Sequence, residues 1–229
     1  MKKSGLFIVA IIVISCFFRT GLAAESGSGK PGISVANWGN GKVYFFRGNE
    51  YIRWDIKADK ADPGYPKPIY PTWTGIPWTD GIDAVATWDN GKAYFFKGNE
   101  YIRCDIKADQ VDPGYPKPIY PTWTGLPWKD GIDAVTEWGN GKAYFFKGNE
   151  YVRWDIKADK ADPEYPKPVY PTWTGLPWSD GIDGAVIWDN GKAYFFKGSE
   201  YIRWDIKADK ADPGYPKVFD GTTWPGLWK

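Results

Sequence analysis

The sequence contains no histidine and little cysteine, and both absences limit the chemistry available to it. Because none of the 229 residues is histidine, no His–nucleophile pair and no Cys/His metal cluster can form. The cysteines are Cys16 and Cys104, and Cys16 lies in a segment that we expect to be removed. Cys104 would then stand alone, which excludes an intramolecular disulfide. A Gly-rich phosphate loop is also lacking. We therefore expect a protein that is not an enzyme.

Long apolar runs are absent from the sequence beyond its first residues. Residues 1–24 combine a basic start, an apolar stretch over residues 6–14 and small residues at 21–24, which is typical of a secretory signal peptide. We expect cleavage near Ala23 or Ala24, a flexible linker over residues 25–31, and a secreted, extracellular protein with no transmembrane segment. An alternative is a lipid anchor through Cys16, since residues 13–16 also resemble a bacterial lipoprotein signal.

An excess of charge of one sign is lacking as well. The whole chain has a formal net charge of +1. Removing residues 1–24 takes away Lys2, Lys3 and Arg19, so that 26 of the 29 basic residues remain against 28 acidic ones, a net charge of −2. Such a balance gives no general attraction to nucleic acid or to an anionic membrane, and we expect neither as a partner.

One segment of about fifty residues is written four times. Trp38, Trp88, Trp138 and Trp188 follow one another at intervals of fifty, and the motifs "GNEY", "DIKAD" and "YPK" keep the same spacing. A repeat of this length is typical of solenoids and propellers, in which each copy buries its apolar surface against the next.

Within one copy the pattern favours β-strands. In the second copy, residues 82–88 and 92–97 are rich in apolar and β-branched residues and flank the turn signal "DNG". The turn "GNE" leads to a third predicted strand over residues 101–108. Residues 112–128 contain too many prolines for a central strand, so we expect a short outer strand or a helical turn there.

Both faces of the middle strand are apolar, and this favours a closed ring. Ala93 and Phe95 point to one side of the strand, and Tyr94 and Phe96 to the other. A sheet with two apolar faces must be covered on both, and four such sheets around an axis cover one another. We therefore predict an all-β fold, a four-bladed β-propeller with one four-stranded blade per repeat. The predicted domain spans residues 32–229, with blades at about 32–80, 81–130, 131–180 and 181–229.

Cys104 occupies a position that is tryptophan in the other copies, namely Trp54, Trp154 and Trp204. One interpretation is a reactive thiol, with its pKa lowered by Arg103 and nearby lysines. The other is a position in the packed interior that holds a smaller apolar side chain. We favour the packing interpretation, since no histidine is present to activate the thiol.

The motifs "YFFKGNEYIRWD", "DPGYPKPI" and "GLPW…GIDAV" resemble the haemopexin-like repeat, and the similarity of the copies most resembles bacterial photopexin-type proteins. The resemblance covers nearly all of the sequence after residue 31. It implies a four-bladed propeller with a central channel that is lined by the first strand of each blade. It also implies a non-catalytic scaffold that binds a protein or a small-molecule ligand such as haem or a polyamine, as a monomer or weak homodimer.

The resemblance further implies a calcium or sodium ion in the channel, held by backbone carbonyl groups, with chloride as a second candidate ion. Hard cations prefer such oxygen ligands. By position, an outer ring of carbonyl groups would come from Ile33, Asp83, Asp133 and Asp183. A deeper ring would come from Val35, Val85, Val135 and Ala185. Ile33 breaks the aspartate pattern, which does not matter for a carbonyl ligand.

Haemopexin itself binds haem through histidines, and the composition excludes such bis-histidine ligation here. Haem held by tyrosine, by Cys104 or by aromatic stacking stays open. An alternative function is multivalent, lectin-like carbohydrate binding, in which Trp73, Trp78 and their counterparts stack on sugar rings. The other interpretation of these tryptophans, which we favour, is that they wedge between blades.

Two sets of aspartates also have two interpretations. Asp55, Asp59 and Asp62, with their copies, are candidates for a surface calcium site or an acid/base pair, but we favour a solvated sheet edge. The aspartate of "GID", which is Asp83 in the second copy, either braces the neighbouring blade or assists an ion at the channel mouth. We favour bracing.

Overall fold

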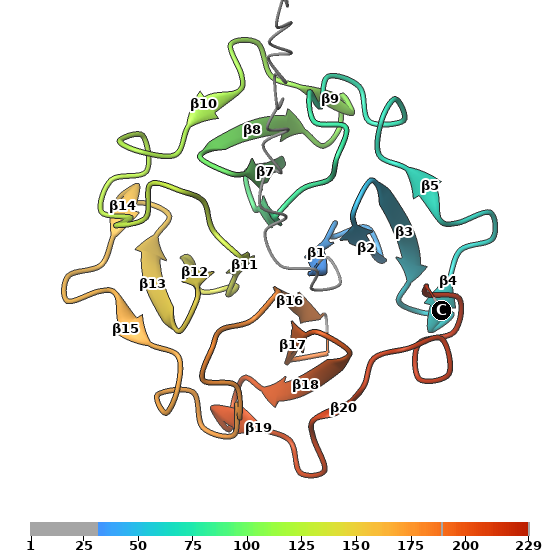
Figure 1. Ribbon diagram of the computed structural model, residues 1–229, viewed down its shortest axis with the longest axis vertical. Coiled ribbons are helices and arrows are strands. Elements are labelled where there is room, and N and C mark those ends of the chain that lie inside the picture. The colour runs from blue at the N-terminus through green and yellow to red at the C-terminus, as the bar shows by residue number, and fades with distance from the viewer. Residues whose placement is uncertain (1–31, 189, 229) are drawn as a thin grey trace, which may run out of the picture.

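The computed structural model describes residues 32–188 and 190–228, which form twenty β-strands and no helix. The strands build four antiparallel sheets, and Figure 1 shows these sheets arranged as blades around a central axis. The predicted all-β, four-bladed propeller is therefore confirmed. The predicted signal peptide, the linker over residues 25–31 and Cys16 lie outside the described residues. No described helix is long and apolar enough to cross a membrane.

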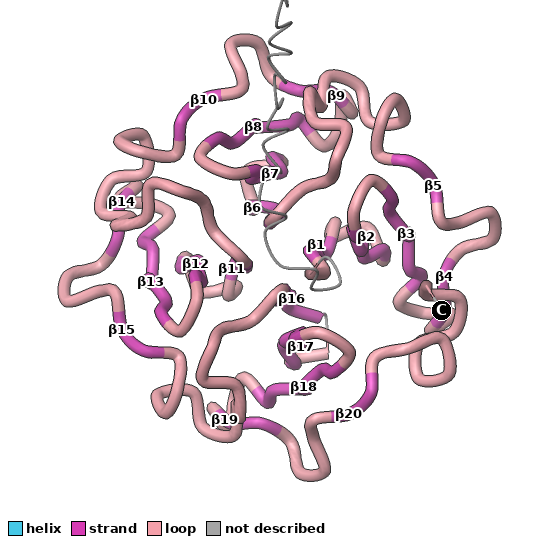
Figure 2. Tube along the Cα trace, in the orientation of Figure 1, coloured by secondary structure: helices cyan, strands magenta, loops and turns pink. Residues whose placement is uncertain are grey.

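Each blade has the same strand order, and its first strand lies nearest the axis (Figure 2). Blade 1 contains β1 (Ser34–Asn37), β2 (Lys42–Arg47), β3 (Glu50–Asp55), β4 (Lys60–Ala61) and β5 (Lys67–Pro68). Blade 2 contains β6 (Ala84–Trp88), β7 (Lys92–Lys97), β8 (Glu100–Asp105), β9 (Gln110–Val111) and β10 (Lys117–Pro118). Blade 3 contains β11 (Ala134–Glu137), β12 (Lys142–Lys147), β13 (Glu150–Asp155), β14 (Lys160–Ala161) and β15 (Lys167–Pro168). Blade 4 contains β16 (Gly184–Trp188), β17 (Lys192–Lys197), β18 (Glu200–Asp205), β19 (Lys210–Ala211) and β20 (Lys217–Val218).

The two predicted hairpin turns are present in every blade. In blade 2, the Asn90 side chain accepts a hydrogen bond from the backbone N–H of Lys92 at 3.0 Å. Gly91 and Gly98 have φ angles of 75° and 52°, in the left-handed region that glycine reaches without steric cost. The turns thereby set the antiparallel register in which Phe95 lies opposite Ile102.

The outer edge of each blade differs from the single outer strand or helical turn that we expected. Two separate strands of two residues each pair with opposite ends of the third strand. In blade 1, Ala61 lies opposite Trp54, and Lys67 lies opposite Tyr51. The proline-rich stretch between them interrupts the pairing, because proline has no N–H to donate to a ladder.

The core consists of four apolar clusters, one at each seam between adjacent blades. Phe95 of blade 2 packs in the cluster shared with blade 1, whereas Phe96 packs in the cluster shared with blade 3. Both rings are fully buried. The seam between blades 4 and 1 is built in the same way, with the Phe45 and Phe196 ring centroids 5.8 Å apart. The alternation in the middle strand thus covers both faces of every sheet, and the ring is closed.

Each repeat ends with a segment that crosses to the next blade. The carbonyl groups of Thr124 and Thr174 accept hydrogen bonds from Ala161 and Ala211 of the following blade, at 2.9 and 3.0 Å. Pro225 makes the equivalent bond with Ala61 of blade 1, at 3.0 Å, and so closes the ring. The first tryptophan of the predicted motif wedges between blades at three seams, where Trp123, Trp173 and Trp224 are only 5–6% exposed. Trp73 packs at the remaining seam but is only partly buried. The second tryptophan of each motif also packs at a seam and is only partly buried; these residues are Trp78, Trp128, Trp178 and Trp228.

Cys104 is buried in the seam between blades 1 and 2, with 6% of its surface exposed. Burial, with smaller contributions from Asp112 and Asp109, raises the pKa of its thiol to about 12. The alternative in which Arg103 and nearby lysines lower this pKa is therefore wrong. Opposite Cys104 in the ladder lies Val111, at a position that is alanine in the other three blades. Val111 packs against the same cluster as Cys104, and we expect this larger side chain to compensate for part of the missing indole.

Candidate functional site: the central channel

The first strands β1, β6, β11 and β16 lie around the central axis (Figure 2), and a cavity lies at each end of this ring of strands. One mouth lies at the starts of these strands and has a cavity of about 310 Å³, which we call the aspartate mouth because Asp83, Asp133 and Asp183 line it. The other mouth lies at the ends of the strands and has a cavity of about 390 Å³. We call it the variable mouth, because the four blades differ there in sequence.

At the aspartate mouth, the aspartate side chains brace their own blades. The Oδ2 atoms of Asp83, Asp133 and Asp183 each accept a hydrogen bond of 2.7 Å from a backbone N–H in the turn between the second and third strands of the same blade. The donor in blade 2 is Gly98. Bracing was the interpretation that we favoured, but its partner is the aspartate's own blade and not the neighbouring one.

The aspartate mouth carries more negative than positive charge. In blade 2, one ammonium group, that of Lys97, lies 3.4 Å from the carboxylates of both Asp80 and Asp83. The same arrangement of two carboxylates around one lysine recurs in blades 3 and 4, at 3.3 to 3.9 Å. Each of these three corners thus has one carboxylate in excess. In blade 1, Ile33 takes the aspartate position, and Arg47 stacks instead on Trp228 at 4.4 Å.

The structure brings the residues of both predicted carbonyl rings to the channel strands. Ile33, Asp83, Asp133 and Asp183 directly precede the first strands, and the deeper set lies within them, where Val35, Val85, Val135 and Ala185 are 1–2% exposed. The carbonyl oxygen of Ile33 lies against Gly184, where a Cβ would be only 2.2 Å from it. No group of three or more Asp, Glu or Cys side chains among the described residues is placed to hold a metal ion.

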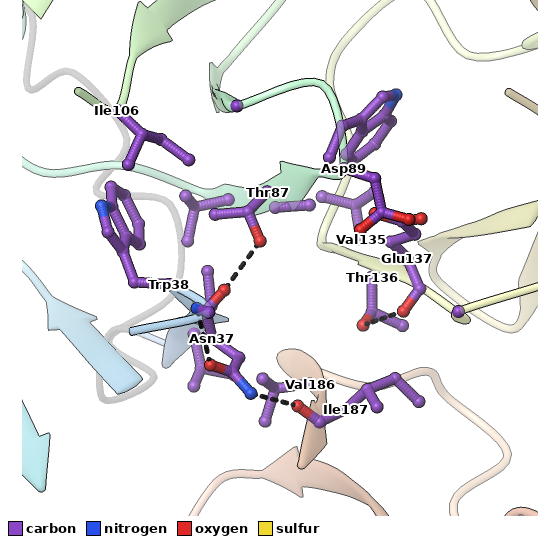
Figure 3. A pocket seen from close by; sticks show the side chains of 18 residues that line it. Asn37, Trp38, Thr87, Asp89, Ile106, Val135, Thr136, Glu137, Val186 and Ile187 are labelled. Carbon is purple, nitrogen blue, oxygen red and sulfur yellow. Dashed lines mark hydrogen bonds between the residues drawn. The ribbon is translucent and has the colours of Figure 1, made fainter. Parts of the chain in front are cut away.

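At the variable mouth, the equivalent positions of the four blades hold Asn37, Thr87, Glu137 and Ile187 (Figure 3). Their polar side chains join neighbouring blades. The Thr87 hydroxyl donates to the carbonyl of Asn37 at 2.7 Å, and the Asn37 amide donates to the carbonyl of Ile187 at 3.2 Å. Polar links therefore cross two seams here.

Glu137 makes the third link at the variable mouth. Its side chain lies beside that of Asp89 from blade 2, as Figure 3 shows, and it accepts a hydrogen bond from the Asp89 backbone. Burial raises the pKa of Glu137 to about 7, and the charge of Asp89 contributes to the same shift. We had not singled out this residue from the sequence. The signal was the difference among the four copies, since a position that varies within near-identical repeats is not set by the scaffold.

At the rim, Asp55 and Asp62 belong to an ion network that recurs in every blade. The Lys42 ammonium lies 2.7 Å from Asp55 and 2.9 Å from Asp62, and Arg53 also pairs with Asp62. Burial of Asp62 acts against ionisation, but hydrogen bonds from Lys42 and Arg53 outweigh it, so the pKa of Asp62 lies below its usual value. The network fastens the outer edge of the blade to its inner strands, whereas we had expected solvated carboxylates there.

Comparisons with known proteins agree with this architecture. The family model described as Hemopexin matches four segments of the chain, residues 34–77, 82–127, 132–177 and 182–218. These segments contain most of the four blades. The chain therefore belongs to the haemopexin-repeat family. A search of curated proteins gave no match.

Solved structures with the same fold include proteins of plant seeds. A seed albumin from Lathyrus sativus has 22% identity and a TM-score of 0.72, with 88% of this chain and 97% of that chain covered. A plant albumin from Cicer arietinum showing hemagglutination has 24% identity, a TM-score of 0.72 and the same coverage. A plant lectin with two metal binding sites, also from Cicer arietinum, has 24% identity and a TM-score of 0.72, with coverage of 85% and 96%. At these identities the likeness shows the fold.

Proposed function

We propose that this protein is a secreted, non-catalytic binding scaffold that carries a cation, calcium or sodium, in its central channel. The observation behind the proposal is the excess of carboxylate charge at the aspartate mouth, where two carboxylates share one lysine at three of the four corners. A negative potential at the end of a narrow channel concentrates cations there. The plant lectin from Cicer arietinum, with its two metal binding sites, supports the proposal by analogy.

The carboxylates of the aspartate mouth are already bound to glycine N–H groups and lysines, so the proposed ligands are backbone oxygens. The outer candidates are the carbonyl groups of Ile33, Asp83, Asp133 and Asp183, and the deeper ones those of Val35, Val85, Val135 and Ala185. Oxygen donors of this kind suit calcium and sodium. A bound ion would hold the four first strands together and neutralise part of the charge, and chloride remains a candidate for a second ion.

The test is the metal content and the thermal stability of the purified full chain. We expect elemental analysis to find one bound cation per chain, and the melting temperature to fall either with a calcium chelator or when choline replaces sodium. The variant Asp83→Asn keeps the carbonyl group and removes the carboxylate, so it should retain the ion. Absence of a bound cation, together with a melting temperature that responds to neither treatment, would refute the proposal.

A second candidate function is multivalent carbohydrate binding. It is supported by aromatic clefts that recur between the blades and by the hemagglutination named for the albumin from Cicer arietinum. The proposed sugar contacts are not the tryptophans that wedge between blades, because these are 5–6% exposed. Agglutination of red cells by the full chain, and its inhibition by free sugar, tests this function.

Haem and polyamine remain candidate small-molecule ligands, and a protein partner remains an alternative. A haem titration that leaves the Soret band unchanged would remove haem from this set. Secretion, the alternative lipid anchor at Cys16, and a monomer or weak homodimer are part of the same proposal. Mass spectrometry of the exported protein distinguishes cleavage after Ala23 or Ala24 from lipidation, and sedimentation analysis gives the oligomeric state.

A further inference from the structure

Two cavities at the outer part of the propeller, which we call the rim clefts, lie between adjacent blades. The cleft between blades 4 and 1 has a volume of about 550 Å³, and the cleft between blades 3 and 4 a volume of about 150 Å³. The first is lined by Trp188, Tyr194, Tyr201, Arg203 and Tyr215 of blade 4 and by Asp59 of blade 1. The second is lined by the equivalent residues Trp138, Tyr144, Tyr151, Arg153, Tyr165 and Asp209. The same residue types occupy the equivalent positions at the other two seams, with Arg53 and Asp109 between blades 1 and 2 and Arg103 and Asp159 between blades 2 and 3.

The walls of the larger cleft combine hydrogen-bonding groups of both kinds. The charge of Arg203 is compensated by Asp212, with which its Nε pairs. Burial raises the pKa of Tyr201 to about 12, so its hydroxyl stays protonated at neutral pH. On the opposite side, Asp59 contributes an exposed carboxylate from a turn in which its φ is 50°. Donors therefore stand on the blade 4 side and an acceptor on the blade 1 side.

Aromatic rings form the rest of these walls. At the larger cleft, the rings of Tyr194 and Tyr215 are half-buried and can face a ligand, whereas Trp188 and Trp224 behind them are 5–7% exposed. At the smaller cleft, Tyr144 and Tyr165 take the equivalent places and are likewise half-buried. Concave sites with aromatic walls and a few converging polar groups are typical of binding sites for small molecules.

We propose that the rim clefts are binding sites for a neutral pyranose sugar. The inference rests on the carbohydrate-binding function above and names its site and ligand class. A pyranose presents apolar C–H faces to aromatic rings and hydroxyl groups at its edge, and neighbouring hydroxyls can donate to Asp59 while they accept from Arg203. An anionic sugar is disfavoured, because the arginine charge is already compensated and Asp59 repels a second negative charge. A purely apolar ligand would leave the tyrosine hydroxyls and Asp59 without partners.

Because the cleft recurs, one chain can bind more than one sugar at a time. Two sites on one rigid ring allow a chain to contact two sugars on the same surface or on different surfaces. Binding at one site raises the effective concentration of the surface near the other, so that weak sites combine to give firm attachment. This arrangement would agglutinate cells without oligomerisation of the chain.

The first test is binding of the full chain to an array that carries neutral glycans together with sialylated and sulfated ones. We expect neutral glycans to be bound, and the methyl glycoside of the preferred terminal sugar to titrate with at least two sites per chain by calorimetry. Asp59→Asn and Asp209→Asn remove the carboxylates, and asparagine tolerates the left-handed turn. Loss of a hydrogen bond to a charged group weakens binding by about tenfold at each site.

Matched variants separate a binding role from a structural one. Asp80→Asn changes the same kind of residue at the aspartate mouth, outside both rim clefts, and should bind sugar normally. Tyr194→Phe keeps the ring and removes only the hydroxyl, so weaker binding at an unchanged melting temperature supports direct contact. Each variant is checked by its thermal melt before titration.

The outcomes distinguish the inference from the function on which it rests. Binding to neutral sugars that survives replacement of all four equivalent aspartates by asparagine would place the site elsewhere and refute the inference, while carbohydrate binding would stand; these aspartates are Asp59, Asp109, Asp159 and Asp209. Binding confined to sialylated or sulfated glycans would refute the ligand class. If no glycan is bound and no cells are agglutinated, both the inference and the carbohydrate function fail, whereas a channel cation remains open to its own test.

Discussion

The exchange of tryptophan for cysteine at position 104 leads to a quantitative prediction about coupled packing. In the other seams, the equivalent tryptophans pack at a tilted angle against the wedge tryptophan of the preceding blade, with ring centroids 5.0 to 5.2 Å apart. Trp154 is 1% exposed and faces Ala161 in the ladder. At the blade 2 position, Cys104 faces Val111, and the cavity beside them is only about 10 Å³.

The magnitudes follow from these contacts. Removal of a buried indole costs about 3 kcal/mol of unfolding free energy, and we expect this loss for Trp154→Cys. Cys104→Trp alone should not stabilise the protein, because the remaining space is too small for an indole and overpacking costs about 1–3 kcal/mol. Cys104→Trp combined with Val111→Ala recreates the pairing of the other blades and should gain about 2 kcal/mol relative to the natural chain.

The assay is denaturant unfolding of the four proteins of this double-mutant cycle, followed by tryptophan fluorescence and circular dichroism. We expect a coupling free energy between positions 104 and 111 of about 2 kcal/mol or more, since residues in contact are not additive. Trp154→Cys with and without Ala161→Val provides the reverse cycle in blade 3. Coupling below about 0.5 kcal/mol in both cycles would refute the argument that valine compensates for the missing indole.

Three further predictions concern the channel and the rim. The pKa of Glu137 is raised from 4.5 to about 7, so ionisation of this side chain destabilises the protein as the pH rises through this range. After a discount for solvent screening, Glu137→Gln should raise the unfolding free energy by about 1 kcal/mol at pH 8 in urea titrations. An equally large gain at pH 4 would contradict this explanation. The pKa of Asp62 is lowered, so its carboxylate stabilises the folded protein at neutral pH. Asp62→Asn should therefore lower the melting temperature at pH 7, and pH-dependent melts should show that this difference disappears as the pH falls below 3.8. Gly184→Ala should cost about 1–3 kcal/mol in denaturant unfolding, because its Cβ would meet the Ile33 carbonyl at 2.2 Å, and an unchanged midpoint would show that the seam can relax.

The closed ring could be predicted because the middle strand of each blade has two apolar faces, which is visible in the sequence. The alternation of Phe95 and Phe96 to opposite faces is visible in six residues, and their burial in two different seams is its direct result. The interior placement of Cys104 followed from comparison with its three tryptophan counterparts. Both features are local or repeat with a fixed period, so a single sequence is sufficient to find them.

Other features depend on partners that lie far apart in the sequence. The ion network joins Lys42 to Asp62, twenty residues away, and nothing in the charge pattern distinguishes this pairing from a solvated edge. The split outer strand depends on which end of the third strand each short piece reaches. The compensation of Cys104 by Val111 and the assignment of Asp83 to its own blade likewise required the register of the strands.

Because the last segment of each repeat packs on the following blade, all four seams are connected in the same way. Trp228 in blade 4 corresponds to Trp178 in blade 3, and Gly32 in blade 1 corresponds to Ile182 in blade 4. Only residues 179–181 separate Trp178 from Ile182. A three-residue bridge of that composition, placed between Trp228 and Gly32, would turn the chain into a covalent circle. Such a circle could be opened at any of the three natural crossovers to give a circular permutant with the same four seams. The fold therefore does not depend on which blade comes first in the sequence.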